Sequence, residues 1–325
     1  TFSAMRVMLL VAGVGLLAGV AQAVPYNVSN TTSSTDFESW TVGDTINQYT
    51  DEGDRGLTWS ADDEWVGSPE DFDEEIVSTG SNKAWRVSAA AGGGGFSGEP
   101  WTPSVVAVGE PGSHLWNDRG SDHTSPLDPP NENGSPVMDV FTASFDFKSE
   151  TDALQEDLFL SVSPGPRQSS FRQSYIGLDA ESDNASGGMD ITFYETVDGG
   201  GFQSHTVAEG LDPSVFHNVK IRIRFHDGVN GDGTGNDEVD VWVNDTQELT
   251  GVSTWETYYR NTSAFSDTPE VAVDSLLFNL NDGGPNTLDH GLLFDNVNIE
   301  ATPEPATLGL LALGGLALIR RRRTA

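Results

Sequence analysis

The chain has 325 residues, with 16 Lys and Arg against 50 Asp and Glu, a formal net charge of −34 and no Cys. This charge excludes a duplex nucleic-acid binder, which needs a basic face against phosphate, and it excludes simple adhesion to anionic lipid. The lack of Cys excludes a disulfide scaffold, thiol chemistry and Cys-ligated zinc. The length suffices for one large β domain or two ordinary domains, and an apolar fraction of 36% argues against wholesale disorder.

Residues 1–23 have the three parts of a secretory signal peptide. Arg6 supplies a basic start, residues 7–20 form an uncharged apolar run, and Ala21-Gln22-Ala23 is a small-x-small cleavage pattern. We therefore predict an N-terminal signal helix that is removed after Ala23. A buried helix of the folded domain is the alternative interpretation of the apolar run. The polar residues 24–35 predict a flexible lead or a first edge strand.

Six segments of the body place apolar side chains at every second residue, and clusters of Gly, Pro, Asn and Asp separate them. This pattern predicts half-buried antiparallel strands joined by turns. The side chains expected to face the core are Phe141, Ala143, Phe145 and Phe147; Leu158, Leu160 and Val162; Met189, Ile191 and Phe193; Val219, Ile221, Ile223 and Phe225; Val239, Val241 and Val243; and Leu293, Val297 and Ile299.

No segment of the body has the caps and the period of a helix, so the predicted fold is all-β. We expect a two-sheet antiparallel jelly-roll sandwich over residues 36–300. Residues 92–135 are rich in Gly and Pro and predict a long, decorated loop region.

Three segments of the body carry a further pattern: the opening Asp36-Phe37-Glu38, residues 218–260 with their ending Trp255-Glu256-Thr257-Tyr258-Tyr259-Arg260, and the closing residues 294–299. Together they resemble the concanavalin A-like (laminin G-like) jelly rolls found in exported bacterial proteins. The resemblance implies two packed antiparallel sheets, one of them concave, and a family inclined to bind glycans.

Residues 301–325 combine the motif Pro303-Glu304-Pro305, an apolar segment over residues 306–319 and the basic tail Arg320, Arg321, Arg322 and Arg323. As a helix, the apolar segment is about 21 Å long, short against a hydrocarbon core of about 30 Å. The three parts resemble the bacterial PEP-CTERM sorting signal. The resemblance implies transient membrane insertion of a short transmembrane helix, recognition by an exosortase-type enzyme, and delivery to the envelope surface or an extracellular matrix. A plain C-terminal membrane anchor is the alternative.

A candidate glycan-binding face lies on two consecutive predicted strands. By alternation, Asp240, Trp242 and Asn244 share one outward face, and Arg222 and Arg224 share the outward face of the preceding strand with Lys220. An aromatic ring can stack on a sugar, while Arg, Asp and Asn can bind its hydroxyls or an anionic substituent. The alternative is a solvated face that is neutralised by cross-strand pairs, such as Asp240 with Arg222 or Arg224.

The same strand carries a partial catalytic signature. Glu238-Val239-Asp240 resembles the start of the Glu-x-Asp-x-Glu motif of laminarinase-type glycoside hydrolases. Retaining hydrolysis needs two carboxyl groups about 5–5.5 Å apart, one acting as nucleophile and one as acid. Trp242 or Val243 stands where the second Glu of the motif belongs, so we do not predict an enzyme at this site.

The loop before Glu238 is rich in oxygen donors. Asp227, Asn230, Asp232 and Asp237 could supply ligands to calcium, which takes six to eight oxygens. Gly228 stands where an EF-hand loop begins with Asp, so the loop is not an EF-hand. A hairpin loop built of good turn formers is the alternative. Calcium is the one cofactor that the sequence suggests.

Three functions remain open at this point. The first is an exported, non-catalytic surface or matrix protein that binds extracellular polysaccharide. The second is a purely structural envelope protein without a specific ligand. The third is a polysaccharide hydrolase or lyase that uses carboxylates from residues 92–135.

Overall fold

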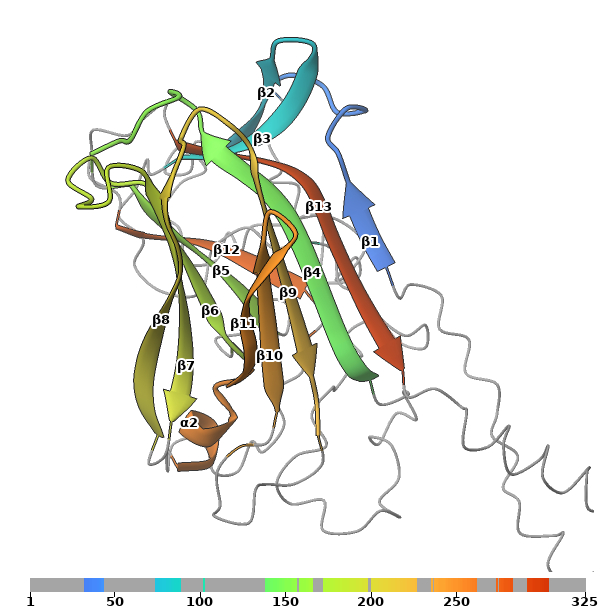
Figure 1. Ribbon diagram of the computed structural model, residues 1–325. Coiled ribbons are helices and arrows are strands. Elements are labelled where there is room, and N and C mark those ends of the chain that lie inside the picture. The colour runs from blue at the N-terminus through green and yellow to red at the C-terminus, as the bar shows by residue number, and fades with distance from the viewer. Residues whose placement is uncertain are drawn as a thin grey trace, which may run out of the picture.

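The computed structural model describes residues 32–43, 74–88, 102, 138–156, 158–165, 172–197, 200–226, 235, 237–261, 273, 275–282 and 291–303. These residues form two antiparallel β-sheets packed face to face, which confirms the predicted all-β sandwich (Figure 1). The predicted signal peptide and residues 304–325 lie outside the described residues, as does the predicted loop region apart from Thr102. Within the described part of the chain, no helix combines the length and the apolar character needed to cross a membrane.

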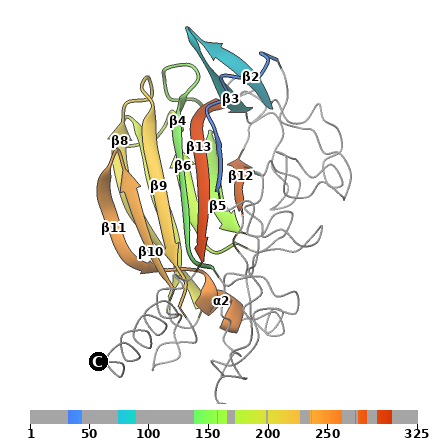
Figure 2. The ribbon, with the colours of Figure 1, turned by 90° about the vertical axis from the view of Figure 1, so that its right-hand side faces the viewer.

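The larger sheet has eight strands. Its order is β11 (Thr246–Ser253), β10 (Glu238–Val243), β9 (His217–Arg224), β4 (Met138–Ser149), β13 (Gly291–Pro303), β3 (Asn82–Ser88) and β2 (Glu74–Thr79). The eighth strand, β1 (Thr32–Thr35), pairs with β13, so the end of the predicted lead is a strand. Figure 2 shows β11, β10, β9, β4 and β13 side by side in this layer.

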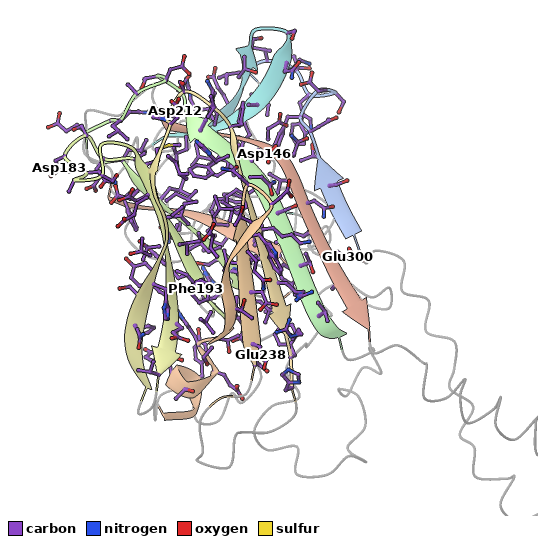
Figure 3. All side chains as sticks on the ribbon, viewed as in Figure 1. Asp146, Asp183, Phe193, Asp212, Glu238 and Glu300 are labelled. Carbon is purple, nitrogen blue, oxygen red and sulfur yellow. The ribbon has the colours of Figure 1, made fainter. Side chains whose placement is uncertain are left out.

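The smaller sheet has five strands. Its order is β12 (Ser275–Asp282), β5 (Phe159–Gly165), β6 (Tyr175–Asp179), β7 (Met189–Val197) and β8 (Gly201–Leu211). Alternation confirms most of the predicted core, because the inward residues of β4, β7, β9 and β10 are buried. Phe193 of β7, labelled in Figure 3, is one of the largest fully buried side chains.

Aromatic rings join the two sheets. Phe278 of β12 meets Trp85 of β3 and Phe294 of β13, each with ring centroids 4.9 Å apart, and Phe145 of β4 at 5.9 Å. All three contacts are edge-on, the arrangement that the quadrupole of an aromatic ring favours. Phe278 is therefore one of the side chains that anchor the smaller sheet on the larger one.

The predicted orientation of Leu293 is wrong. The pairing of β13 with β4 shifts register between Asp295 and Asn298, so the strand contains a bulge. An extra residue in one strand reverses the faces on its two sides. Consequently Phe294 and Val297 both join the core, whereas Leu293 is buried on the other face of the strand.

The structure also contains a short helix that the sequence analysis did not predict. α2 (Glu256–Asn261) begins after Thr254, whose hydroxyl accepts a hydrogen bond from the backbone N–H of Glu256 at 3.2 Å. Glu256 lies in the first turn, where a negative charge is favourable. The hydroxyl of Tyr259 holds the helix in place, because it donates to the carbonyl of Arg172 at 2.8 Å and accepts from the N–H of Arg172 at 2.7 Å.

Candidate functional site

The cationic stripe, which we define as Lys220, Arg222 and Arg224, runs along the outward face of β9. Its neighbours on β9 are the core residues Val219, Ile221 and Ile223, so alternation turns the stripe away from the core. In the register with β10, the three residues of the stripe lie opposite Trp242, Asp240 and Glu238, in that order. Each cation thus faces either an aromatic ring or a carboxylate. Glu238, the first residue of β10, is labelled in Figure 3.

Asp240 is enclosed by the stripe. Its Oδ2 accepts hydrogen bonds from Arg222 Nη2 at 2.6 Å and from Arg224 Nη1, and its Oδ1 accepts from the N–H of Gly251 at 3.0 Å. The carboxylate side chain is only 1% exposed. Burial opposes ionisation, but these hydrogen bonds outweigh it and hold the pKa of Asp240 below its usual value. The cross-strand pairs that the sequence suggested are therefore present.

Arg224 is held by two carboxylates. Its Nη2 lies 2.6 Å from Glu238 Oε2, and its Nη1 contacts Asp240. Burial alone would lower the pKa of Arg224, yet the bonds to both carboxylates raise it overall. The guanidinium is consequently fixed as a cation between two strands.

Trp242 forms a composite surface with the other two cations. Lys220 Nζ lies 5.2 Å from the ring centroid, and Arg222 Cζ lies 5.1 Å from it. Both distances are within the range of a cation–π contact. The side chain of Arg222 remains 39% exposed even though its Nε and Nη2 bind Asp240. An anionic ligand can therefore meet Arg222 and Lys220 beside a half-buried indole ring.

Asn244 stands at the turn end of β10. It lies in the two-residue turn between β10 and β11, and both Asn244 and Asp245 have positive φ, at 49° and 64°. Its Oδ1 accepts from the N–H of Asn218 at 3.0 Å, and its Nδ2 lies 3.1 Å from His217 Nδ1. Its amide group closes the hairpin onto β9, so its contribution to ligand binding stays a prediction.

The proposed calcium ligands are only partly described. Asp227, Asn230 and Asp232 lie outside the described residues. Asp237 is buried, its Oδ1 accepts from the N–H of His226 at 2.9 Å, and its own N–H donates to Glu256 Oε2 at 3.3 Å. Among the side chains that the structure places, no three His, Cys, Asp or Glu residues are arranged to hold a metal ion. Calcium binding by this loop stays a prediction.

The structure contains a second feature that the alternation along single strands does not predict, which we call the aromatic row: Phe159, Tyr175, Tyr194, Phe202, Trp255 and Tyr258. These residues come from β5, β6, β7, β8 and the segment around α2, and Tyr194 lies on the face of β7 opposite to the core residue Phe193. In the sequence, the segment Trp255-Glu256-Thr257-Tyr258 indicates only a resemblance to a fold. Its concentration of aromatic residues was the signal that could have indicated a surface.

The chain matches one known sorting motif near its C-terminus and is only distantly similar to solved structures. The family description of the PEP-CTERM protein-sorting motif matches residues 301–323. No curated protein matches the chain. A mutant of alginate lyase Aly36B in complex with alginate trisaccharide is 11% identical, with a TM-score of 0.45 over 84% of this chain and 98% of that chain.

Two further solved structures are similar at the same low level. The binding domain of botulinum neurotoxin serotype D is 10% identical, with a TM-score of 0.38 over 91% of this chain and 53% of that chain. Alginate lyase vAL-1 from Chlorella virus is 9% identical, with a TM-score of 0.35 over 71% of this chain and 90% of that chain. What the comparisons add about function comes from the sorting motif, which implies export and processing by an exosortase.

Proposed function

We propose that this protein is a non-catalytic component of the cell surface or the extracellular matrix, and that it binds acidic polysaccharide through the outward face of β9 and β10. The observation that carries the proposal is the placement of Lys220 and Arg222 on Trp242. A PEP-CTERM motif at residues 301–323 agrees with delivery to the exterior, where such polymers occur.

The net charge of the whole protein is strongly negative, so the local charge of the cationic stripe matters for the binding of an anionic polymer. At a net charge of −34 the molecule repels a polyanion at long range. Salt screens that repulsion beyond about 8–10 Å, so a polyanion that reaches the sheet responds mainly to the nearest charges. On β9 these are three cations, of which Arg222 and Arg224 are paired with Asp240 and Glu238 of β10. Lys220 contacts a ring and, among the described residues, forms no ion pair, so it supplies the excess positive charge of this face. The outward face of β9 and β10 thus favours the binding of sugars that carry uronic-acid or sulfate groups.

The carboxylates beside the stripe support a binding role over a hydrolytic one. A glycosidase needs one carboxyl group with a raised pKa that can protonate the leaving group. Asp240 has a lowered pKa because of its bonds to Arg222 and Arg224, and Glu238 is bonded to Arg224. The same ion pairs favour the second candidate, a structural envelope protein in which the stripe only stabilises the sheet.

Affinity electrophoresis of the full-length protein in gels that contain alginate separates these two candidates. We expect retardation that weakens as salt is added, and Lys220→Gln combined with Arg222→Gln should weaken the interaction about tenfold. Lys148→Gln is the matched control, because Lys148 also contacts an aromatic ring, Phe216, at 5.7 Å. Absence of retardation, or equal retardation of the wild type and the double variant, would favour the structural role.

A further inference from the structure

We infer that the aromatic row on the smaller sheet is a second carbohydrate-binding site, and that its ligand is a neutral, hydroxyl-rich polysaccharide. This inference goes beyond the proposed function, because it concerns another sheet, another set of residues and another class of ligand. The rings of the row continue from one strand to the next. A chain of several sugar units could therefore lie along them.

The geometry of the row suits stacking against sugar rings. The planes of Tyr175 and Trp255 are inclined by only 13°, with centroids 6.3 Å apart, and Phe159 lies 6.4 Å from Tyr175 at 24°. Phe202 extends the row beyond Trp255, which it meets edge-on at 73° with a centroid distance of 5.0 Å. Tyr194 stands edge-on to Tyr175, at 84°, so the row combines near-parallel and edge-on rings. Such a mixed aromatic surface can contact the apolar C–H faces of sugar rings.

Backbone contacts hold the row in place before any ligand arrives. Trp255 Nε1 donates to the carbonyl of Tyr194 at 2.9 Å, and the N–H of Trp255 donates to the carbonyl of Gln173 at 2.8 Å. Gly177 provides the space for Phe159, because a Cβ atom at this position would lie 2.6 Å from Cζ of the ring. A surface that is already ordered loses little conformational entropy on binding.

One end of the row is open to solvent. Phe202 is 53% exposed, although it contacts Trp255 and also Tyr258, whose centroid lies 5.1 Å away. Single exposed hydrophobic residues are common, but an exposed aromatic residue that continues an ordered series of rings is typical of a contact surface. Phe202 is therefore the position from which a ligand can be probed without opening the core.

The charge beside the row selects against acidic sugars. Asp179 lies on the outward face of β6, two residues beyond Gly177, and burial together with Asp190 and Asp183 raises its pKa. Burial and the charge of Asp179 also raise the pKa of Tyr194. A carboxylate at this place repels anionic substituents and accepts hydrogen bonds from sugar hydroxyls. The row and the cationic stripe thus differ in the ligand that each favours.

Two sites on opposite sheets would allow one molecule to connect two kinds of polymer. The stripe faces outward from β9, and the row faces outward from β5, β6 and β7, with the core between them. A protein that binds one acidic and one neutral chain at the same time gains avidity in a mixed matrix without further contacts. This arrangement would suit a protein that is sorted to the cell exterior.

Affinity electrophoresis of the full-length protein in gels that contain laminarin, hydroxyethyl cellulose or galactomannan tests the inference. We expect retardation in at least one of these neutral gels, and Phe202→Ala should weaken it about three- to tenfold. Phe216→Ala is the matched control, because Phe216 is also an exposed aromatic residue, at 37%, but contacts Lys148 instead of the row. Circular dichroism of both variants verifies that the sandwich is intact.

Three results would overturn the inference. They are no retardation in any neutral gel, equal weakening by Phe202→Ala and Phe216→Ala, and a loss of self-association in Phe202→Ala, seen by size-exclusion chromatography, without a change in retardation. The combined Lys220 and Arg222 variant should leave neutral binding unchanged, and Phe202→Ala should leave alginate binding unchanged. Failure of one site can therefore be distinguished from failure of the other.

Discussion

Pro303, the first residue of the Pro303-Glu304-Pro305 motif, is paired with Met138 of β4. The motif therefore begins inside the last strand of the sandwich, with no linker between the fold and the expected processing site. We expect the processing enzyme to act on an unpaired segment, and therefore expect the end of β13 to separate from β4 before cleavage. Strand ends open locally at a much smaller free-energy cost than global unfolding.

A linker should therefore accelerate processing. We predict that about eight Gly and Ser residues inserted between Thr302 and Pro303 shorten the lifetime of the unprocessed form by about threefold or more, because the end of β13 no longer has to open. Pulse-chase labelling of the native cells, followed by mass spectrometry of the mature C-terminus, measures this. An unchanged or longer lifetime would show that opening of the strand does not limit the reaction.

Asp240 should contribute to stability rather than only to ligand binding. We expect Asp240→Asn to lower the free energy of unfolding by about 1–2 kcal/mol, because it leaves the charges of Arg222 and Arg224 partly uncompensated at the sheet surface. Glu238→Gln, whose parent side chain is 45% exposed, should cost less than about 1 kcal/mol. Urea denaturation compares the two variants, and an equal effect of both would contradict the enclosed position of Asp240.

The lowered pKa of Asp240 also determines whether the stability of the fold rises or falls with pH. In the unfolded chain this carboxyl group binds a proton at a higher pH than in the folded protein. Its stabilising contribution is thus complete above the unfolded value of about 3.9 and is lost as the pH falls through the lower folded value. Asp240→Asn should remove this loss of stability at acidic pH. A wild-type and a variant curve of equal slope below about pH 4 would refute the prediction.

Ionisation of Asp295 should lower the stability of the fold, whereas ionisation of Asp240 raises it. Burial raises the pKa of Asp295 to about 6, with further contributions from the charges of Asp146, Glu38 and Asp36. Between about pH 4 and this value the folded state binds more protons than the unfolded state, so its contribution to stability falls as the pH rises. Asp295→Asn should raise Tm at pH 7.5 by about 2–4 °C, equivalent to about 1 kcal/mol after allowance for solvent screening.

The comparison for Asp295 is Asp183→Asn, which changes an exposed carboxylate in another part of the protein. It should leave Tm within about one degree of the wild type. A lower Tm of Asp295→Asn at pH 7.5 would mean that the negative charge is needed there, as it would be if a cation were bound.

Phe278→Ala should be the most destabilising of these changes. The ring of Phe278 contacts Trp85, Phe145 and Phe294 of the other sheet, and its removal leaves a cavity between the sheets. Such truncations cost about 3–5 kcal/mol. Thermal or urea denaturation measures the loss, and a cost below about 1 kcal/mol would contradict the anchoring role of the ring.

Local patterns predicted a large part of this molecule. Alternation identified the inward residues of β4, β7, β9 and β10, because a strand repeats every two residues whatever its neighbours are. The pairing of Asp240 with Arg222 followed from two strands joined by a single loop. The sorting motif at residues 301–323 is a continuous segment, so the sequence alone was sufficient to recognise it.

The tertiary structure decided what depends on residues far apart in the chain. The bulge after Asp295 moved Leu293 to the other face, because the insertion exists only relative to the partner strand β4. The aromatic row exists only because strand order brings Phe159, Tyr175 and Tyr194 together, and because α2 then folds back beside β7 (Figure 1). The alternation of apolar and polar residues predicts to which face of its own strand a side chain points. Only the packing of the strands determines what that side chain meets.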